Sequence, residues 1–305
     1  MRPIPPRLLV LLASLAFAAA GTAQAHPLWG GLQPGPHPVG FRTLWKLDYS
    51  RTYRTAFDDG ATYGAEKAPR PVLINQWYPA AGESDAAAMP YRRYLDIRSE
   101  DAQLKKLALA LIDYAQTVMA QGILGQPLEH VEGEKREFFD RLLATPTACR
   151  LGASPGAGPF PLVIYHAGTA SSFEDNAILC EYLASHGFVV LGSAYQDAEG
   201  DSLRVDAGGG SVRDLEFLAR FARTLPYVDW GRVAVVGHSA GGQAALRFAA
   251  RPDSVANSVV LLDTTQDYYS LEMPTYRDLV DEIARGSTNV VAPILAVAGP
   301  EAMFA

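Results

Sequence analysis

The chain has 305 residues, 49% hydrophobic and 19% charged, which suits one large globular domain, with or without an inserted segment. Its formal net charge is −7, and it has no basic run that could meet the phosphates of a nucleic acid or an anionic membrane. The composition therefore argues against nucleic acid as a partner.

Residues 1–25 have the pattern of an export signal. Two arginines precede an apolar stretch from Leu8 to Ala20, and residues 23–25, Ala-Gln-Ala, form the small-x-small pattern that signal peptidase cuts. The apolar stretch is too short to span a bilayer comfortably. We therefore predict a cleaved signal peptide, a mature chain starting at His26, and a secreted or periplasmic protein with no stable membrane anchor. An uncleaved N-terminal anchor is the alternative.

The only two cysteines are Cys149 and Cys180. In an oxidising compartment they could form a disulfide, but a pair of cysteines can equally stay free and buried, so both alternatives remain open. Neither cysteine has the spacing of a metal ligand and the six histidines are scattered, so we expect no metal site and no cofactor.

In the first half of the domain, a strand is followed by a helical stretch. Residues 72–78 are rich in β-formers and end at Pro79, which predicts a strand. From a possible N-cap at Ser99, apolar residues recur at helical spacing, and a second helix is predicted over Glu134–Leu143. We expect this insertion to cover about 97–147 of a domain spanning 26–305. It could be a cap over the site or a packed side layer.

After the Pro- and Gly-rich residues 153–161, short apolar strands alternate with helices. Strands are predicted over 162–166, 188–195, 232–237, 258–263 and 291–299. Helices are predicted over 173–186, 211–225, 240–251 and 275–286. This alternation predicts an α/β fold with a mostly parallel, doubly wound sheet covered on both faces. The site of such a sheet forms at the carboxyl ends of its strands.

Ser239 lies between Gly237 and Gly241, where an apolar strand gives way to a helix. A direct strand-to-helix turn strains the central residue and requires very small side chains two positions before and after it. The turn presents the serine hydroxyl at the edge of the sheet, and the N-terminus of the following helix stabilises developing negative charge. We therefore predict Ser239 as a nucleophile; an inert turn serine is the alternative.

The chain resembles α/β-hydrolases of the platelet-activating-factor acetylhydrolase type and their bacterial exported esterase relatives, which are related to dienelactone hydrolases. The resemblance rests on "GPHPVGFRTLWKLDYSR", "PVLINQWYPA", "FPLVIYHAG", "LASHGFVV", "GHSAGG" and "VVLLD", and covers most of the mature chain. It implies an α/β-hydrolase fold and a serine esterase of lipid degradation that cleaves small-molecule carboxylic esters through an acyl-enzyme. A dienelactone-type reaction is weakened, because that group uses cysteine where Ser239 stands.

The resemblance also implies an oxyanion hole. Residues 166–169, His-Ala-Gly-Thr, align with the family's Ser-His-Gly-apolar loop. The backbone N–H groups of Thr169 and Ala240 would then hold the oxyanion. Ala167 stands where the family has a histidine, which makes the conformation of this loop less certain.

The sequence offers two candidates for the acid of the expected triad, but no histidine where the base is expected. Asp263 closes the strand "SVVLLD", where the resemblance places the acid, and Glu301 is the alternative. No histidine follows His238, although the base of this fold comes after the last strand. We therefore expect a C-terminally truncated chain that lacks the last strand and helix and has little activity of its own.

Other functions and the oligomeric state remain open. Acyl transfer and peptide cleavage are possible on the same fold, and so is a binding role without catalysis.

Overall fold

The structure is a computed structural model of the chain. It describes residues 26–52, 55–56, 62–63, 68–82, 87–169, 171–199, 202–205, 209–264, 277, 280–281, 284–286 and 292–297. The expected signal peptide, Glu301 and half of the helix expected over 275–286 lie outside these residues.

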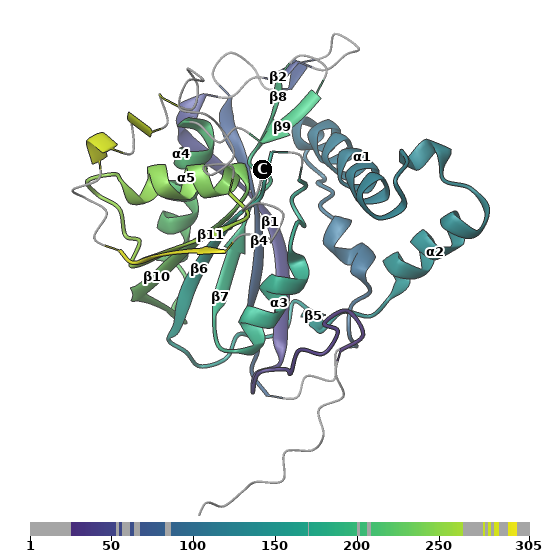
Figure 1. The fold of residues 1–305 in the computed structure, drawn as a ribbon, viewed down its shortest axis with the longest axis horizontal. Helices are drawn as coiled ribbons and strands as arrows, with labels where there is room; N and C mark the ends of the chain where they lie inside the picture. The colour runs from purple at the N-terminus through teal and green to yellow at the C-terminus, as the bar shows by residue number, and fades with distance from the viewer. Residues whose placement is uncertain are drawn as a thin grey trace, which may run out of the picture.

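One eight-stranded sheet forms the centre of the protein, in the order β12-β11-β10-β6-β7-β4-β1-β5 (Figure 1). The five strands from β12 to β7 are parallel, whereas β4 pairs antiparallel with both β7 and β1. The strands are β1 (Val39–Thr52), β4 (Pro69–Pro79), β5 (Cys149–Leu151), β6 (Phe160–His166), β7 (Val189–Gly192), β10 (Val228–His238), β11 (Ser258–Leu262) and β12 (Ile294–Val297). The predicted mostly parallel sheet is confirmed.

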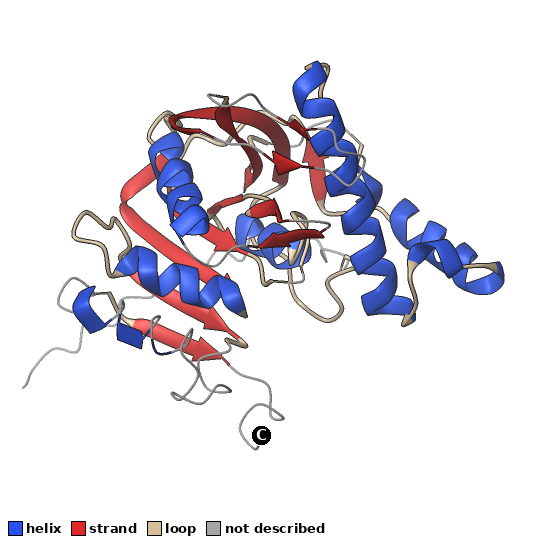
Figure 2. Ribbon diagram, turned by 90° about the horizontal axis from the view of Figure 1, so that it is seen from above, coloured by secondary structure: helices blue, strands red, loops and turns tan. Residues whose placement is uncertain are grey.

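Helices pack on both faces of this curved sheet (Figure 2). They are α1 (Ala102–Leu124), α2 (Gly133–Ala144), α3 (Ala177–Ser185), α4 (Gly209–Ala222) and α5 (Ala240–Ala249), with the short 3₁₀ helices η1 (Tyr91–Leu95) and η2 (Leu128–His130). Along β6, Leu162 and Ile164 join the core under α4 and α5, while Val163 and Tyr165 join the core under α3. Successive strand residues point to opposite faces, so a strand buried on both sides is apolar throughout.

The helices α1 and α2 stand beside the β1–β5 side of the sheet (Figure 1). One face of α1, with Leu107, Leu111 and Ala115, packs on Leu73 of β4 and on Phe173. Residues 104–124 are also long and apolar enough to span a membrane by length and composition alone, with 28% of the most apolar window buried. Both helices lie within the expected insertion.

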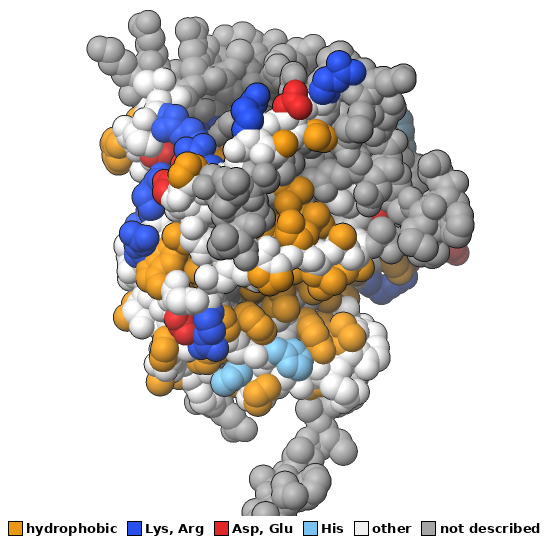
Figure 3. All heavy atoms as spheres, turned by 60° about the vertical axis from the view of Figure 1, so that its left-hand side comes forward, with side chains coloured by type: hydrophobic (Ala, Val, Ile, Leu, Met, Phe, Trp, Pro, Cys, Tyr) orange, Lys and Arg blue, Asp and Glu red, His pale blue; other side chains and the backbone are white. Residues whose placement is uncertain are grey.

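At the opposite edge, β12 leaves apolar side chains on the surface. Ile294, Leu295 and Val297 are all exposed, Leu295 by 58%. Figure 3 views the molecule from this side, where hydrophobic side chains gather across the middle of the surface. The edge strand therefore contributes little to the core.

Two predicted elements were wrong at one end, because a residue there has a left-handed backbone. The helix expected over 173–186 begins at Ala177, since Asn176 has a φ of 54° that a helix interior excludes. The strand expected over 188–195 ends at Gly192, since Tyr195 has a φ of 53°.

Three features were missing from the sequence-based interpretation or left open by it. The strands β1 and β5 of the central sheet were not predicted. The two-stranded ribbons β2 (Thr55–Ala56) with β3 (Thr62–Tyr63) and β8 (Gln196–Glu199) with β9 (Ser202–Val205) were not predicted either. Cys149 and Cys180 are both free and buried, which settles the alternative left open for them.

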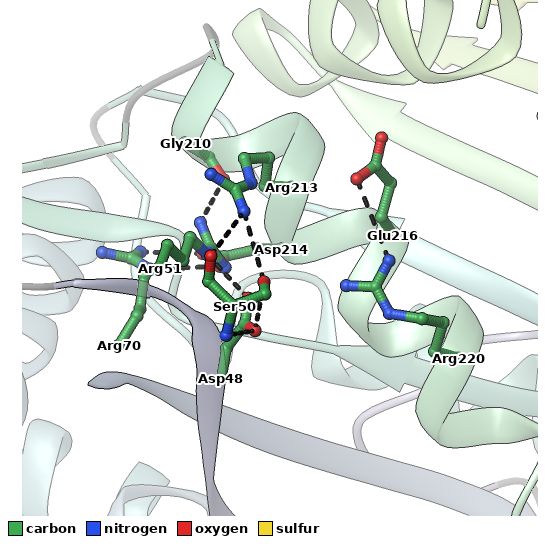
Figure 4. A network of polar contacts seen from close by, with 9 residues as sticks. All are labelled: Asp48, Ser50, Arg51, Arg70, Gly210, Arg213, Asp214, Glu216 and Arg220. Carbon is green, nitrogen blue, oxygen red and sulfur yellow. Dashed lines mark hydrogen bonds and ion pairs between the residues drawn. The ribbon is translucent and has the colours of Figure 1, made fainter.

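A buried ion cluster ties α4 to the sheet (Figure 4). Arg70 of β4 donates Nε and Nη2 to the two carboxylate oxygens of Asp214 on α4, at 3.0 and 2.7 Å. Arg51 of β1 pairs with the same carboxylate and donates Nε to Asp48 at 2.7 Å. All four side chains are at most 9% exposed. Burial would raise the pKa of Asp48, but hydrogen bonds from Ser50 and Arg51 hold it below its ordinary value.

Replacing Asp214 with asparagine should strongly destabilise the fold. The change removes the negative charge that two buried guanidinium groups share, and a broken buried pair costs about 3 kcal/mol or more. Urea unfolding followed by circular dichroism measures the loss. Glu137→Gln, which breaks an exposed pair with Arg141 on α2, should cost less than about 1 kcal/mol. Equal losses would contradict the role given to the cluster.

Candidate active site

Ser239 occupies a strained turn between β10 and α5. Its φ of 51° and ψ of −121° fit neither the strand before it nor the helix after it. Its N–H donates to the carbonyl of Leu262 at 2.8 Å, and its own carbonyl accepts from the N–H of Gly242 at 2.9 Å. These bonds hold Ser239 at the carboxyl edge of the sheet.

Glycines surround the turn because side chains would not fit. A Cβ on Gly237 would collide with the backbone of Gly241 and Gly242. A Cβ on Gly241 would collide with the carbonyl oxygens of His166 and Ala167. The G-x-S-x-G pattern is therefore a packing requirement on two sides of Ser239.

The loop that follows β6 passes directly against the serine. A Cβ on Gly168 would lie 3.1 Å from Ser239 Cβ, closer than most real contacts of that kind. The carbonyl of Gly168 accepts from the N–H of Ser171 at 3.2 Å, so this loop turns at Thr169. Thr169 is exposed on this loop. Ala240 lies in the first turn of α5, where helix N–H groups have no partner within the helix.

His166 supports this loop from the core. Its Nδ1 donates to the carbonyl of Ala167 at 2.7 Å, and its ring stacks on Tyr195 at 3.7 Å. The side chain is fully buried. His166 therefore braces the loop in which Ala167 replaces the family's histidine, and it has no access to substrate.

Asp263 follows β11 next to Ser239. Leu262 of β11 is in register with His238 of β10, so the next residues, Asp263 and Ser239, leave adjacent strands at the same level. Asp263 is exposed, has a φ of 46°, and donates its N–H to the carbonyl of Val297 at 2.7 Å. Glu301, the alternative acid, lies outside the described residues.

His238, the residue before the serine, faces Asp175 in the loop before α3. The distance from His238 Nδ1 to Asp175 Oδ2 is 3.3 Å, and Tyr165 donates its hydroxyl to the same oxygen at 2.7 Å. The bond to Asp175 raises the pKa of His238 against the opposing effect of burial, and the charge of Asp263 adds to this. Burial would raise the pKa of Asp175, but the bonds from His238 and Tyr165 hold it below its ordinary value.

The neighbouring Glu174 has the opposite environment. It is buried, and Ser172 donates to its Oε1 at 2.6 Å, while its Oε2 has no hydrogen-bond partner among the described residues. Burial raises its pKa to about 7, opposed by the bond from Ser172 and aided by the charge of Asp175. The sequence-based interpretation missed Glu174 and Asp175, because it placed both in a helix.

The remaining histidines lie in structural positions. His37 packs on Phe160, His186 caps α3 beside Tyr182, and His26 packs on Trp29. His130 ends the short helix η2. Ser239, Thr169, Ala240 and Asp263 follow β10, β6 and β11 at one edge of the sheet, where His238 also lies and pairs with Asp175.

Gly237→Ala should damage the elbow, because its Cβ would overlap the backbone of α5. We expect a loss of about 3 kcal/mol in unfolding free energy, at the upper end of overpacking costs. Gly122→Ala on α1 is the matched control. Its Cβ meets nothing within 4 Å, so it should stabilise the helix by up to about 1 kcal/mol. Thermal unfolding of the two variants provides the comparison, and a Gly237→Ala protein as stable as the parent would refute the packing argument.

Glu174 should make the fold less stable as the pH rises. The pKa of Glu174 is about 7 in the fold and 4.5 in the unfolded chain, so the protonated carboxyl stabilises the fold fully below pH 4.5. This contribution to the unfolding free energy is lost as the pH rises past about 7, and the pKa difference corresponds to about 3 kcal/mol. Urea midpoints between pH 5 and 8 should therefore fall more steeply in the parent than in Glu174→Gln.

The exposed Glu100→Gln serves as the control for this pH series and should follow the parent at every pH. Parallel curves for the parent and Glu174→Gln would show that Glu174 does not carry the pH dependence.

No protein-family model matches the chain, and no curated protein matches it. Among solved structures, it is similar to a ferulic acid esterase from Streptomyces cinnamoneus, with 19% identity and a TM-score of 0.50 over 87% of this chain and 74% of that one. It is also similar to the acylaminoacyl peptidase of Pyrococcus horikoshii, with 18% identity and a TM-score of 0.36 over 47% of this chain and 28% of that one. The first likeness, together with the sheet order, shows that this chain has the α/β-hydrolase fold.

Proposed function

We propose that the protein is an exported serine hydrolase of carboxylic esters, related to the platelet-activating-factor acetylhydrolase type. The observation that carries the proposal is the strained backbone of Ser239, held against Gly168 at the carboxyl edge of the sheet. A serine is kept in such a conformation where its hydroxyl must be presented to a substrate. The ferulic acid esterase of the same fold is consistent with ester chemistry.

In this mechanism the Ser239 hydroxyl attacks the ester carbonyl. The N–H groups of Thr169 and Ala240 stabilise the oxyanion, the alcohol leaves, and water releases the acid from the acyl-enzyme. Asp263 orients the imidazole that accepts the serine proton. From the leader expected over residues 1–25, we propose that the reaction takes place outside the cytoplasm, and the proposal requires no metal or cofactor.

The proposal assigns the role of proton acceptor to none of the six histidines of the chain. His166 is buried against Ala167 and Tyr195, and His238 is paired with Asp175 behind the serine. Proton transfer requires a base within hydrogen-bond reach of the hydroxyl, about 3 Å. Hydrolases without one triad member keep only about 10³–10⁴-fold catalysis over the uncatalysed reaction.

Chemical rescue tests both parts of the proposal. The 305-residue chain and Ser239→Ala should hydrolyse p-nitrophenyl acetate equally slowly. Added imidazole should raise the rate of the parent about tenfold or more above that of Ser239→Ala, since a general base contributes about 10²–10⁴-fold. The Ser239→Ala reaction corrects for hydrolysis by imidazole itself.

Two results would count against the proposal. Turnover that depends on Ser239 without imidazole would contradict an external base, and His238→Gln and His166→Ala would then identify the internal one. Equal rates for the parent and Ser239→Ala with imidazole, together with no fluorophosphonate labelling, would contradict the esterase and favour a binding protein without catalysis.

A further inference from the structure

A cavity of about 610 Å³ lies where η1, α1 and α2 meet. Its lining combines three arginines, two aspartates, one amide and three aliphatic side chains: Arg92, Arg93, Leu95, Asp96, Arg98, Ile112, Gln116, Asp140 and Leu143. The size falls within the range of small-molecule sites, about 300–1,000 Å³. None of the residues assigned to the ester reaction lines it.

The two aspartates of the cavity are already paired. Asp96 forms ion pairs with Arg93 and, at 3.6 Å, with Arg98. Asp140 accepts from Arg136 on the same helix, at 3.2 Å to each oxygen. Three arginines against two aspartates leave one net positive charge on the lining.

Arg92 is the arginine of the lining without an ion pair among the described residues. Its side chain is exposed, and its Nε donates to the carbonyl of Leu143 at the end of α2 in a long bond of 3.4 Å. A guanidinium carries five N–H donors, so the terminal nitrogens keep the fork that matches a carboxylate. The cavity thus has one oriented cationic group.

The rest of the lining consists of the amide of Gln116 and three aliphatic side chains. Leu95 is buried, and Ile112 and Leu143 are partly buried against the core under α1. Their exposed surface faces a cavity that also holds the arginines. An occupant therefore needs an apolar body and one negative charge, which matches the one net positive charge of the lining.

We propose that this cavity binds a carboxylate with an apolar tail, held by the fork of Arg92 and by contacts with Leu95, Ile112 and Leu143. The protein then has a second ligand site, between η1 and the helices of the insertion and separate from Ser239. The proposal does not depend on esterase activity, since binding alone tests it.

Isothermal titration calorimetry of the 305-residue chain with sodium octanoate tests the proposal. We expect saturable binding that is at least tenfold weaker for octan-1-ol, which lacks the charge, and for inorganic phosphate, which lacks the tail. Arg92→Gln should weaken octanoate binding at least tenfold, while Arg141→Gln, an exposed arginine of α2 outside the cavity, should change it less than twofold.

Gln116→Glu keeps the proposal testable if Arg92→Gln unfolds. It adds a negative charge to the lining and should weaken octanoate binding by a similar factor. Absence of octanoate binding to the parent would overturn the proposal, as would equal binding of octan-1-ol or phosphate. Binding that neither Arg92→Gln nor Gln116→Glu changes would also overturn it, because the octanoate would then lie elsewhere.

Discussion

Ser239 keeps a backbone conformation that costs a non-glycine residue about 1–3 kcal/mol, and its surroundings at the carboxyl edge of the sheet must offset that cost. The backbone of α5 passes so close to β10 that position 237 has no room for a side chain. The carbonyls of His166 and Ala167 impose the same limit at position 241. The elbow is thus clamped between its own helix and the neighbouring strand.

The same edge links three strands in sequence. Ser239 donates to Leu262 at the end of β11, and Asp263 donates to Val297 at the end of β12. The position of Asp263 therefore depends on an edge strand whose side chains are all exposed. Ser239, by contrast, is held by β10, which has β6 and β11 on its two sides.

Two adjacent carboxyl groups in the loop before α3 show how partners determine charge. Asp175 receives hydrogen bonds from His238 and Tyr165 and stays ionised, whereas Glu174, with one bond from Ser172, holds its proton to about pH 7.

The sequence predicted the sheet and the elbow because apolar runs and the G-x-S-x-G pattern are local signals. It did not predict the pair of Asp175 with His238, because 63 residues separate them. The spacing of apolar residues also does not reveal the left-handed backbone of Asn176, which makes α3 begin at Ala177.

The two thiols have a consequence for how the protein matures. Cys149 and Cys180 are fully buried, and burial raises the pKa of both well above the ordinary value. The thiolate is the species that attacks disulfides and reacts with oxidants. Because a raised pKa keeps both side chains as thiols, both are unreactive in the fold. The fold has no covalent cross-link to form or to lose. Its assembly therefore needs no thiol oxidase or disulfide isomerase, and the same native state is accessible on either side of a redox boundary.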